Sequence, residues 1–143
     1  MGWTSLHTAA RDGDIKRLKR CVEDIKWLEP VDVNAQSSQG HTPLHMSAAN
    51  GHMEAMQYIL SQKGVEINAQ TKMGNTSLHL AAMNSRDTAC RMLVNHGIGL
   101  QKANKAGKIA ADLCPAQASE LKKYLDIQVA KAENGDDVQE DEV

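Results

Sequence analysis

Apolar residues recur at helical spacing along the chain, and each such stretch follows a shorter run of small residues. The small residues fall at 9–10, 47–49 and 81–82, and Gly13 and Gly51 separate the first two runs from the longer apolar stretches. Polar residues rich in Asn, Gln, Ser and Gly come next, at 36–40 and 70–74. The spacing predicts an all-α chain of repeated short and long helices. The apolar positions of the longer helices are Ile15, Leu18, Cys21, Val22; Met53, Met56, Ile59, Leu60; and Ala89, Met92, Leu93.

Two motifs repeat with one period. A Thr-Pro/Ser-Leu-His tetrad begins at Thr4, Thr42 and Thr76, which are 38 and 34 residues apart. A second motif, Val-Asp-Val-Asn-Ala-Gln at 31–36, returns as Val-Glu-Ile-Asn-Ala-Gln at 65–70, again 34 residues later. Thr suits the N-cap and Pro the first turn of a short helix. A shared period in two independent motifs indicates a solenoid of stacked repeats.

These motifs resemble the ankyrin repeat, which has about 33 residues and the signature Thr-Pro-Leu-His-x-Ala. Residues 45–52 are similar to that family's His-x-Ala-Ala-x-x-Gly-His, with Ser47 in place of an alanine, and His96-Gly97 is similar to its helix-ending His-Gly. The resemblance covers residues 2 to about 114. It implies an ankyrin-repeat solenoid of L-shaped helix pairs with short β-hairpin fingers.

The resemblance divides a domain at 1–132 into repeats at about 2–36, 37–70, 71–103 and 104–131. The first repeat holds four extra residues within 23–30, including Trp27. The third has Ser85-Arg86 where the family has Gly-His. The fourth has Asp112 at the His position, Pro115 after its short helix, and a second helix expected at about 118–130. Terminal repeats of a solenoid differ from the others because one face of each meets water.

Composition agrees with thin layers of helices, because aromatic residues make up only 3% and Phe is absent. No apolar run approaches the roughly 20 residues that span a bilayer, and the first residues lack the pattern of a secretion signal. Three cysteines without C-x-x-C spacing favour a reducing compartment. We therefore expect a soluble protein of the cytoplasm, and also of the nucleus, that is monomeric on its own.

Charge is uneven along the chain. Residues 133–143 carry six acidic residues and no basic one. The other 132 residues hold all 16 Lys and Arg against 18 − 6 = 12 acids, which makes the body about +4. This predicts a disordered acidic tail at 133–143. The tail has three open interpretations: a solubilising appendage, a segment that binds a basic protein or shields the basic body, and a carboxylate-ended PDZ ligand. Its course to a terminal carboxylate favours a full-length protein.

Catalysis and cofactor binding find little support. His7, His45 and His79 recur with the period, so each lies in a different layer, about 10 Å from the next. Metal–ligand bonds are about 2 Å long, so these histidines are too far apart to share a metal. No sequence pattern of a metalloprotease, serine hydrolase, phosphate-binding loop or calcium loop occurs. We expect no enzyme activity, no metal and no cofactor. Each tetrad histidine is expected to form hydrogen bonds with the backbone of a turn and with the neighbouring Thr.

The resemblance implies that a protein partner meets the finger tips and the inner surface of the short helices. Met73 and Met83 stand out there, either as contacts or as ordinary single apolar surface residues. Trp3 is either a binding anchor or a lid over the first layer. The expected partner-binding residues are Trp3, Arg11, Ser38, Gln39, His41, Ala49, Asn50, Lys72, Met73, Asn75, Met83, Asn84, Lys105 and Lys108.

Further expectations concern a regulatory modification and the kind of molecule that the chain binds. Asn34 and Asn68 match the position at which many ankyrin-like repeats are hydroxylated by an asparaginyl hydroxylase. The scarcity of aromatic residues argues against nucleic-acid binding. The leading hypothesis is a non-catalytic protein–protein interaction module that acts as a regulator, inhibitor or adaptor. The alternative is a chaperone or escort for a basic client, such as a ribosomal protein or histone, that uses the acidic tail.

Overall fold

The computed structural model describes residues 4–23 and 32–134, so Trp3 and the extra residues around Trp27 lie outside the described part. Within these ranges the chain forms seven α-helices and one 3-10 helix. In chain order they are α1 (Ser5–Asp12), α2 (Ile15–Glu23), α3 (Pro43–Ala49), α4 (Met53–Leu60), α5 (Ser77–Met83), α6 (Asp87–Asn95), η1 (Ala110–Leu113) and α7 (Ser119–Glu133).

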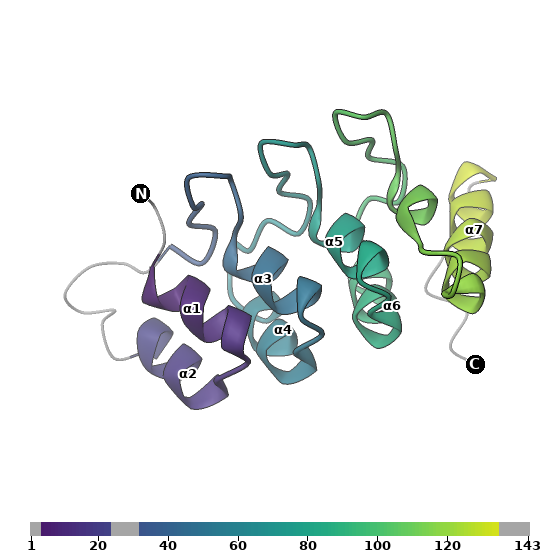
Figure 1. Ribbon diagram of the computed structural model, residues 1–143. Coiled ribbons are helices and arrows are strands. Elements are labelled where there is room, and N and C mark those ends of the chain that lie inside the picture. The colour runs from purple at the N-terminus through teal and green to yellow at the C-terminus, as the bar shows by residue number, and fades with distance from the viewer. Residues whose placement is uncertain (1–3, 24–31, 135–143) are drawn as a thin grey trace.

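The helices stack in pairs along one direction (Figure 1). α1 packs on α3, α3 on α5 and α5 on η1, so the short helices form one row. The second helices of the first three pairs, α2, α4 and α6, form a second row, and α7 packs on η1 at the C-terminal end. Three turns project from the same side of the stack (Figure 1). This is the all-α repeat solenoid that the sequence predicts.

A capping box starts each of the helices α1, α3 and α5. In α3, Thr42 Oγ1 accepts a hydrogen bond from the His45 backbone N–H at 3.4 Å, and His45 Nδ1 accepts one from the Thr42 N–H at 3.0 Å. Pro43 fills the first turn, where the N–H that it lacks would have no helical partner. The tetrad thus fixes the start of each short helix.

Leucines of the tetrads and the alanines that follow them fill the space between layers. Leu6, Leu44 and Leu78 are all buried. Short alanine side chains let neighbouring short helices approach closely, and a buried leucine contributes about 1.5–3 kcal/mol. A core without Phe can therefore be well packed, because the layers are thin. The alanines with no exposed surface are Ala9, Ala10, Ala48, Ala81 and Ala82.

The three projecting turns, which we call finger 1 (residues 36–42), finger 2 (70–76) and finger 3 (103–109), contain no β-strand in the part of the chain that the structure describes. Each finger still has a tight turn closed by backbone hydrogen bonds, such as Ser37 N–H to His41 O at 2.9 Å and Gly40 N–H to Ser37 O at 2.9 Å. One closing pair is too short for a strand ladder. The expected hairpins are therefore turns.

The fourth repeat departs from the others as its sequence indicates. Asp112 lies in η1, and its carboxylate accepts a hydrogen bond from the Ile109 N–H at 3.1 Å, as the histidine ring does elsewhere. α7 runs from Ser119 to Glu133, so it reaches the first residue of the expected tail. Residues 135–143 lie outside the described part, and their disorder stays a prediction. No helix formed by the described residues has the length and apolar character to cross a bilayer.

Candidate partner-binding surface

The histidine of each tetrad joins its own layer to the finger of the next. His7 Nε2 donates to the His41 carbonyl at 2.8 Å, His45 Nε2 to Asn75 O at 3.0 Å, and His79 Nε2 to Lys108 O at 2.9 Å. Since Nδ1 of each ring accepts from a Thr N–H, the proton of the neutral ring lies on Nε2. This confirms the expectation that these histidines bond Thr and turn backbone.

Burial favours the neutral form of the His45 and His79 rings. Desolvation lowers the pKa of His45 from its ordinary 6.5 to about 4, and it lowers the pKa of His79 as well. A doubly protonated ring would lose the Nδ1 lone pair that accepts from Thr42 N–H. The histidine ladder is therefore part of the scaffold and offers no general base at the surface.

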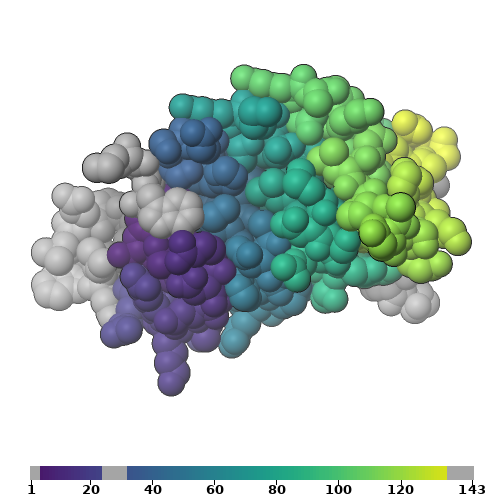
Figure 2. All heavy atoms as spheres, in the orientation of Figure 1, coloured from purple at the N-terminus to yellow at the C-terminus, as the bar shows by residue number. Residues whose placement is uncertain are grey.

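Backbone hydrogen bonds also join the finger tips to each other. Lys72 N–H donates to Gln39 O at 3.0 Å, and Lys105 N–H donates to Met73 O at 2.9 Å. The tips lie close enough that a Cβ added at Gly74 would stand 2.9 Å from the Lys105 nitrogen. The fingers therefore present their side chains in a fixed row, and they form a continuous ridge along the top edge of the molecule (Figure 2).

Six of the expected partner-binding residues form an exposed group on this row, which we call the finger surface. The side chain of Met73 is 65% exposed at the tip of finger 2. The members are Ser38, Gln39, Lys72, Met73, Lys105 and Lys108. His41 and Asn75 lie beside them but are half-buried, since their carbonyls accept from the histidine ladder. Burial also lowers the pKa of His41.

Polar side chains at the ends of the short helices form hydrogen bonds within the chain, which the sequence does not indicate. The Asn50 amide donates to Met46 O at 2.9 Å, and the Asn84 amide donates to Ala49 O at 2.9 Å. Arg11 is exposed and pairs with Asp12 at 2.9 Å. These residues line the expected face, but the two amides and the Ala49 carbonyl are engaged within the chain.

Two half-buried residues on the short helices were not predicted from the sequence. Met46 and Leu80 lie at matching positions of α3 and α5, directly after the tetrad histidine. Leu80 shares a helix face with Met83, three residues on, whose side chain is 40% exposed. The sequence could have indicated them, because the position after the tetrad histidine is apolar in both repeats. We call Met46, Leu80 and Met83 the short-helix surface.

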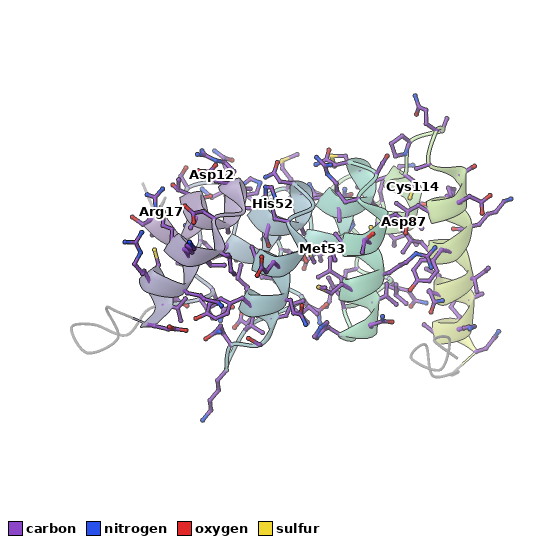
Figure 3. The ribbon with its side chains drawn as sticks, turned by 90° about the horizontal axis from the view of Figure 1, so that it is seen from below. Asp12, Arg17, His52, Met53, Asp87 and Cys114 are labelled. Carbon is purple, nitrogen blue, oxygen red and sulfur yellow. The ribbon has the colours of Figure 1, made fainter. Side chains whose placement is uncertain are left out.

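The side chains that could take part in catalysis or metal binding are packed against neighbouring residues. His52 lies over Gly13, where an added Cβ would be 2.6 Å from its Nδ1, and Arg86 lies over Gly51 in the next layer. His52 precedes α4 and Asp87 begins α6, so the two lie in successive layers of the stack (Figure 3). Burial raises the pKa of the Cys90 thiol to about 12, which disfavours the reactive thiolate. No cluster of metal-ligating side chains occurs among residues 4–23 and 32–134.

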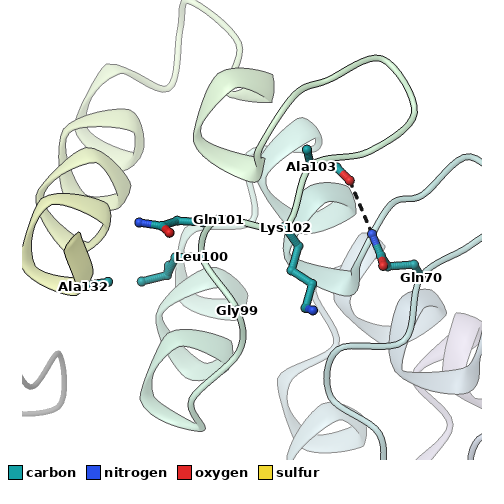
Figure 4. A pocket seen from close by; sticks show the side chains of 7 residues that line it. All are labelled: Gln70, Gly99, Leu100, Gln101, Lys102, Ala103 and Ala132. Carbon is teal, nitrogen blue, oxygen red and sulfur yellow. Dashed lines mark hydrogen bonds between the residues drawn. The ribbon is translucent and has the colours of Figure 1, made fainter. Parts of the chain in front are cut away.

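A groove of about 530 Å³ lies beside the fingers at the C-terminal end. Gln70 and Ala103 meet across it through a hydrogen bond of 3.4 Å, and Lys102 and the end of α7 border it (Figure 4). We call it the C-terminal groove. Its lining is Gln70, Gly99, Leu100, Gln101, Lys102, Ala103 and Ala132.

Comparison with known families agrees with the repeated layers and the histidine ladder. The family profile described as ankyrin repeats, in three copies, matches residues 6–104. The chain belongs to the ankyrin-repeat family. Ankyrin repeats generally mediate protein–protein interaction, and the family typically acts without catalysis.

Known ankyrin-repeat relatives share only part of the chain. Human ankyrin repeat domain-containing protein 7 is 40% identical over 58 residues, which cover 41% of this chain and 21% of that protein. Ankyrin repeat-containing protein YAR1 of Saccharomyces cerevisiae is 41% identical over 51 residues, 36% of this chain and 26% of that protein. Human SOWAHB, also an ankyrin repeat domain-containing protein, is 39% identical over 62 residues, 43% of this chain and 8% of its own length. The chain therefore spans less than a third of each of these relatives.

The two asparagines at the ankyrin hydroxylation position connect neighbouring repeats. Asn34 Nδ2 donates to Gly64 O at 2.8 Å, and Asn34 Oδ1 accepts from Glu66 N–H at 2.8 Å. Asn68 Oδ1 accepts from Gly99 N–H at 2.7 Å. The amides therefore have a structural role in the ankyrin stack, and their hydroxylation stays a prediction.

Proposed function

We propose that this chain binds a protein partner without catalysing a reaction, as a regulator, inhibitor or adaptor in the cytoplasm or nucleus. The contact is formed by the finger surface and the short-helix surface. One observation carries the proposal: Met73 is 65% exposed at the tip of a finger whose backbone is bonded to both neighbouring fingers. Burying such a side chain on binding is favourable, and the rigid support lowers the entropic cost.

Two neighbouring features support a contact at this place. Met83 is 40% exposed at the end of α5, the helix that finger 2 leads into. Methionine adapts to irregular partner surfaces because its chain is flexible and polarisable. Lysines beside Met73 add a positive rim. An apolar centre with a polar rim is the usual arrangement of a protein interface.

The test replaces the two exposed methionines. Partners are captured on the immobilised chain and identified by mass spectrometry, and their affinity is then measured for the variant Met73→Glu/Met83→Glu. We expect a loss of about tenfold or more, which corresponds to about 1.4 kcal/mol. Thermal unfolding should be unchanged because both side chains are exposed.

Ile127→Glu is the matched control. Ile127 is 54% exposed, but it lies on α7, away from the two proposed surfaces. Capture should survive this change. If the double methionine variant binds as well as the unmodified chain, this surface is not the partner site.

The second candidate function is the escort of a basic client. The six acidic residues of 133–143 favour it, because they form a concentrated negative charge on a chain whose remainder is positive. Client binding would then weaken steeply with salt. Neutralising the tail acids should abolish client binding while the methionine changes leave it intact, which separates this function from the first.

A further inference from the structure

Lysines gather at one end of the finger row, on segments that carry no acidic residue of their own. Fingers 2 and 3, with residues 98–102 before finger 3, carry Lys72, Lys102, Lys105 and Lys108 and no acidic residue. All four side chains are exposed. Every ion pair found among the described residues lies elsewhere, on or beside α1, α6 and α7. This part of the surface therefore holds four positive charges that the described residues leave without an ion pair.

One of these lysines, Lys102, lines the C-terminal groove. A Cβ added at Gly99 would lie 3.0 Å from Lys102 Cγ and 3.3 Å from its Cε, so the lysine stem crosses the glycine on one side of the groove. Leu100 forms part of the floor, and Ala132 closes the other side (Figure 4). The groove thus combines Leu100 in its floor with the Lys102 side chain along one edge.

The chain leaves α7 at this same groove. Ala132 lines it, α7 ends at Glu133, and residues 135–143 follow outside the described part. Those nine residues include five acids and no base. Nine residues can extend about 30 Å, and neighbouring layers are about 10 Å apart, so the segment is long enough to reach finger 3 and finger 2.

We propose that residues 135–143 occupy the C-terminal groove and the adjoining lysines of fingers 2 and 3. The acidic side chains pair with Lys102, Lys105 and Lys72. The inference rests on the proposed function, because it gives the finger surface an occupant within the chain that competes with the partner. The opposite charges and the starting point at the groove select this segment over other occupants.

A weak contact is sufficient for this arrangement. A segment tethered by a short linker acts at an effective concentration of about 1 mM. Exposed lysine–carboxylate pairs are individually weak, but several of them form together here. Because it is tethered, the segment binds its own chain even where the same peptide, added separately, binds poorly.

The first experiment maps which lysines the segment touches. A water-soluble carbodiimide joins an amine to a carboxylate that is in contact with it, and mass spectrometry of the isolated monomer identifies the linked residues. We expect links from 135–143 to Lys102, Lys105 and Lys72 in the full chain, and their loss at high salt. Lys16 and Lys19 are the internal control, because they are equally exposed on α2 at the opposite end of the stack.

A second experiment measures occupancy through competition. A synthetic peptide of residues 133–143 is titrated against the full chain and against a full-length variant with a neutral tail. With a peptide Kd of about 0.3 mM and a tethered segment at about 1 mM, the variant should bind the peptide about fourfold more tightly. Lys102→Gln/Lys105→Gln should remove this binding, and Lys16→Gln/Lys19→Gln should not. The neutral tail carries Asp136→Asn, Asp137→Asn, Glu140→Gln, Asp141→Asn and Glu142→Gln.

Absence of links to the finger lysines, or links spread equally to Lys16 and Lys19, would overturn the proposal. Equal peptide affinity for the full chain and its neutral-tail variant would overturn it as well. Neither experiment uses an external partner. A failure here is therefore distinct from a failure of the methionine test, which measures capture of a partner.

Discussion

At the scale of single residues, His45 shows how one side chain holds two repeats together. Its Nδ1 accepts from the Thr42 N–H within its own layer, and its Nε2 donates to Asn75 O at 3.0 Å in the next finger. Both bonds need a neutral ring. Because the ring is buried, any change of its protonation acts directly on the stack.

The first prediction is a loss of stability in mild acid. The pKa of His45 is about 4 in the folded chain and 6.5 ordinarily, so between these values the unfolded chain binds more protons. Stability therefore rises with pH in this window and is lost as the pH falls through it. From pH 7 to pH 5 we expect the free energy of unfolding to drop by about 2 kcal/mol from His45 alone. Urea unfolding at the two pH values measures it.

His45→Gln serves as the control for this prediction. Glutamine at the third helical position can complete a capping box with Thr42, and its amide does not titrate near neutral pH. The variant should retain less of the pH dependence than the unmodified chain. An identical drop in both chains would show that other groups cause it.

The tetrad histidines could be interpreted correctly from the sequence because they repeat with the layer. The amides of Asn50 and Asn84 could not, since their bonds to the Met46 and Ala49 carbonyls depend on the rotamers adopted at the helix ends. The position of Lys102 beside the end of α7 was also missed. This position depends on how α7 packs, and no repeated sequence motif predicts that packing.

At the scale of elements, the fingers are held by their own hydrogen bonds together with bonds to the neighbouring fingers. Each has one turn and one closing pair, too little for a strand. The sequence predicts the turns, because Gly and polar residues recur there. It does not reveal that the tips bond to each other in a row, which is why hairpins were expected instead. The bonds between tips replace the strand ladder.

The second prediction compares two finger glycines. Gly74 and Gly107 have φ values of 81° and 77°, so alanine is strained at both, by about 1–2 kcal/mol. A Cβ at Gly74 would also lie 2.9 Å from the Lys105 nitrogen, while nothing lies within 4 Å of one at Gly107. We expect Gly74→Ala to lower the free energy of unfolding by at least about 1 kcal/mol more than Gly107→Ala. Chemical unfolding of the two variants measures the difference, and equal effects would exclude tight packing between fingers.

At the scale of the whole molecule, the main contacts among the described helices join neighbouring layers. α1 packs on α3 but has no comparable contact with α5, and the core is one elongated cluster of buried residues that runs from layer to layer. The repeat period predicts this arrangement directly. Stability is then close to a sum of local terms along the stack, so damage in one layer spreads only a short distance.

The third prediction concerns two buried leucines, one in the first repeat and one in the third. Leu93 in α6 and Leu18 in α2 are both fully buried, so replacing either with alanine should cost about 2–5 kcal/mol. We expect Leu93→Ala to speed amide hydrogen exchange in α5, α6 and α7, and Leu18→Ala to speed it in α1 and α2. Faster exchange along the entire chain in both variants would contradict local coupling.

The histidine ladder also gives the stack a direction, because every ring donates toward the finger that follows it. At the fourth layer Asp112 takes the place of the ring, and its carboxylate accepts from Ile109 N–H. An ionised carboxylate has no hydrogen to donate. A repeat that followed this layer would find an acceptor where the other layers present a donor. Among the described layers, the series of donors that gives the stack its direction therefore ends at His79.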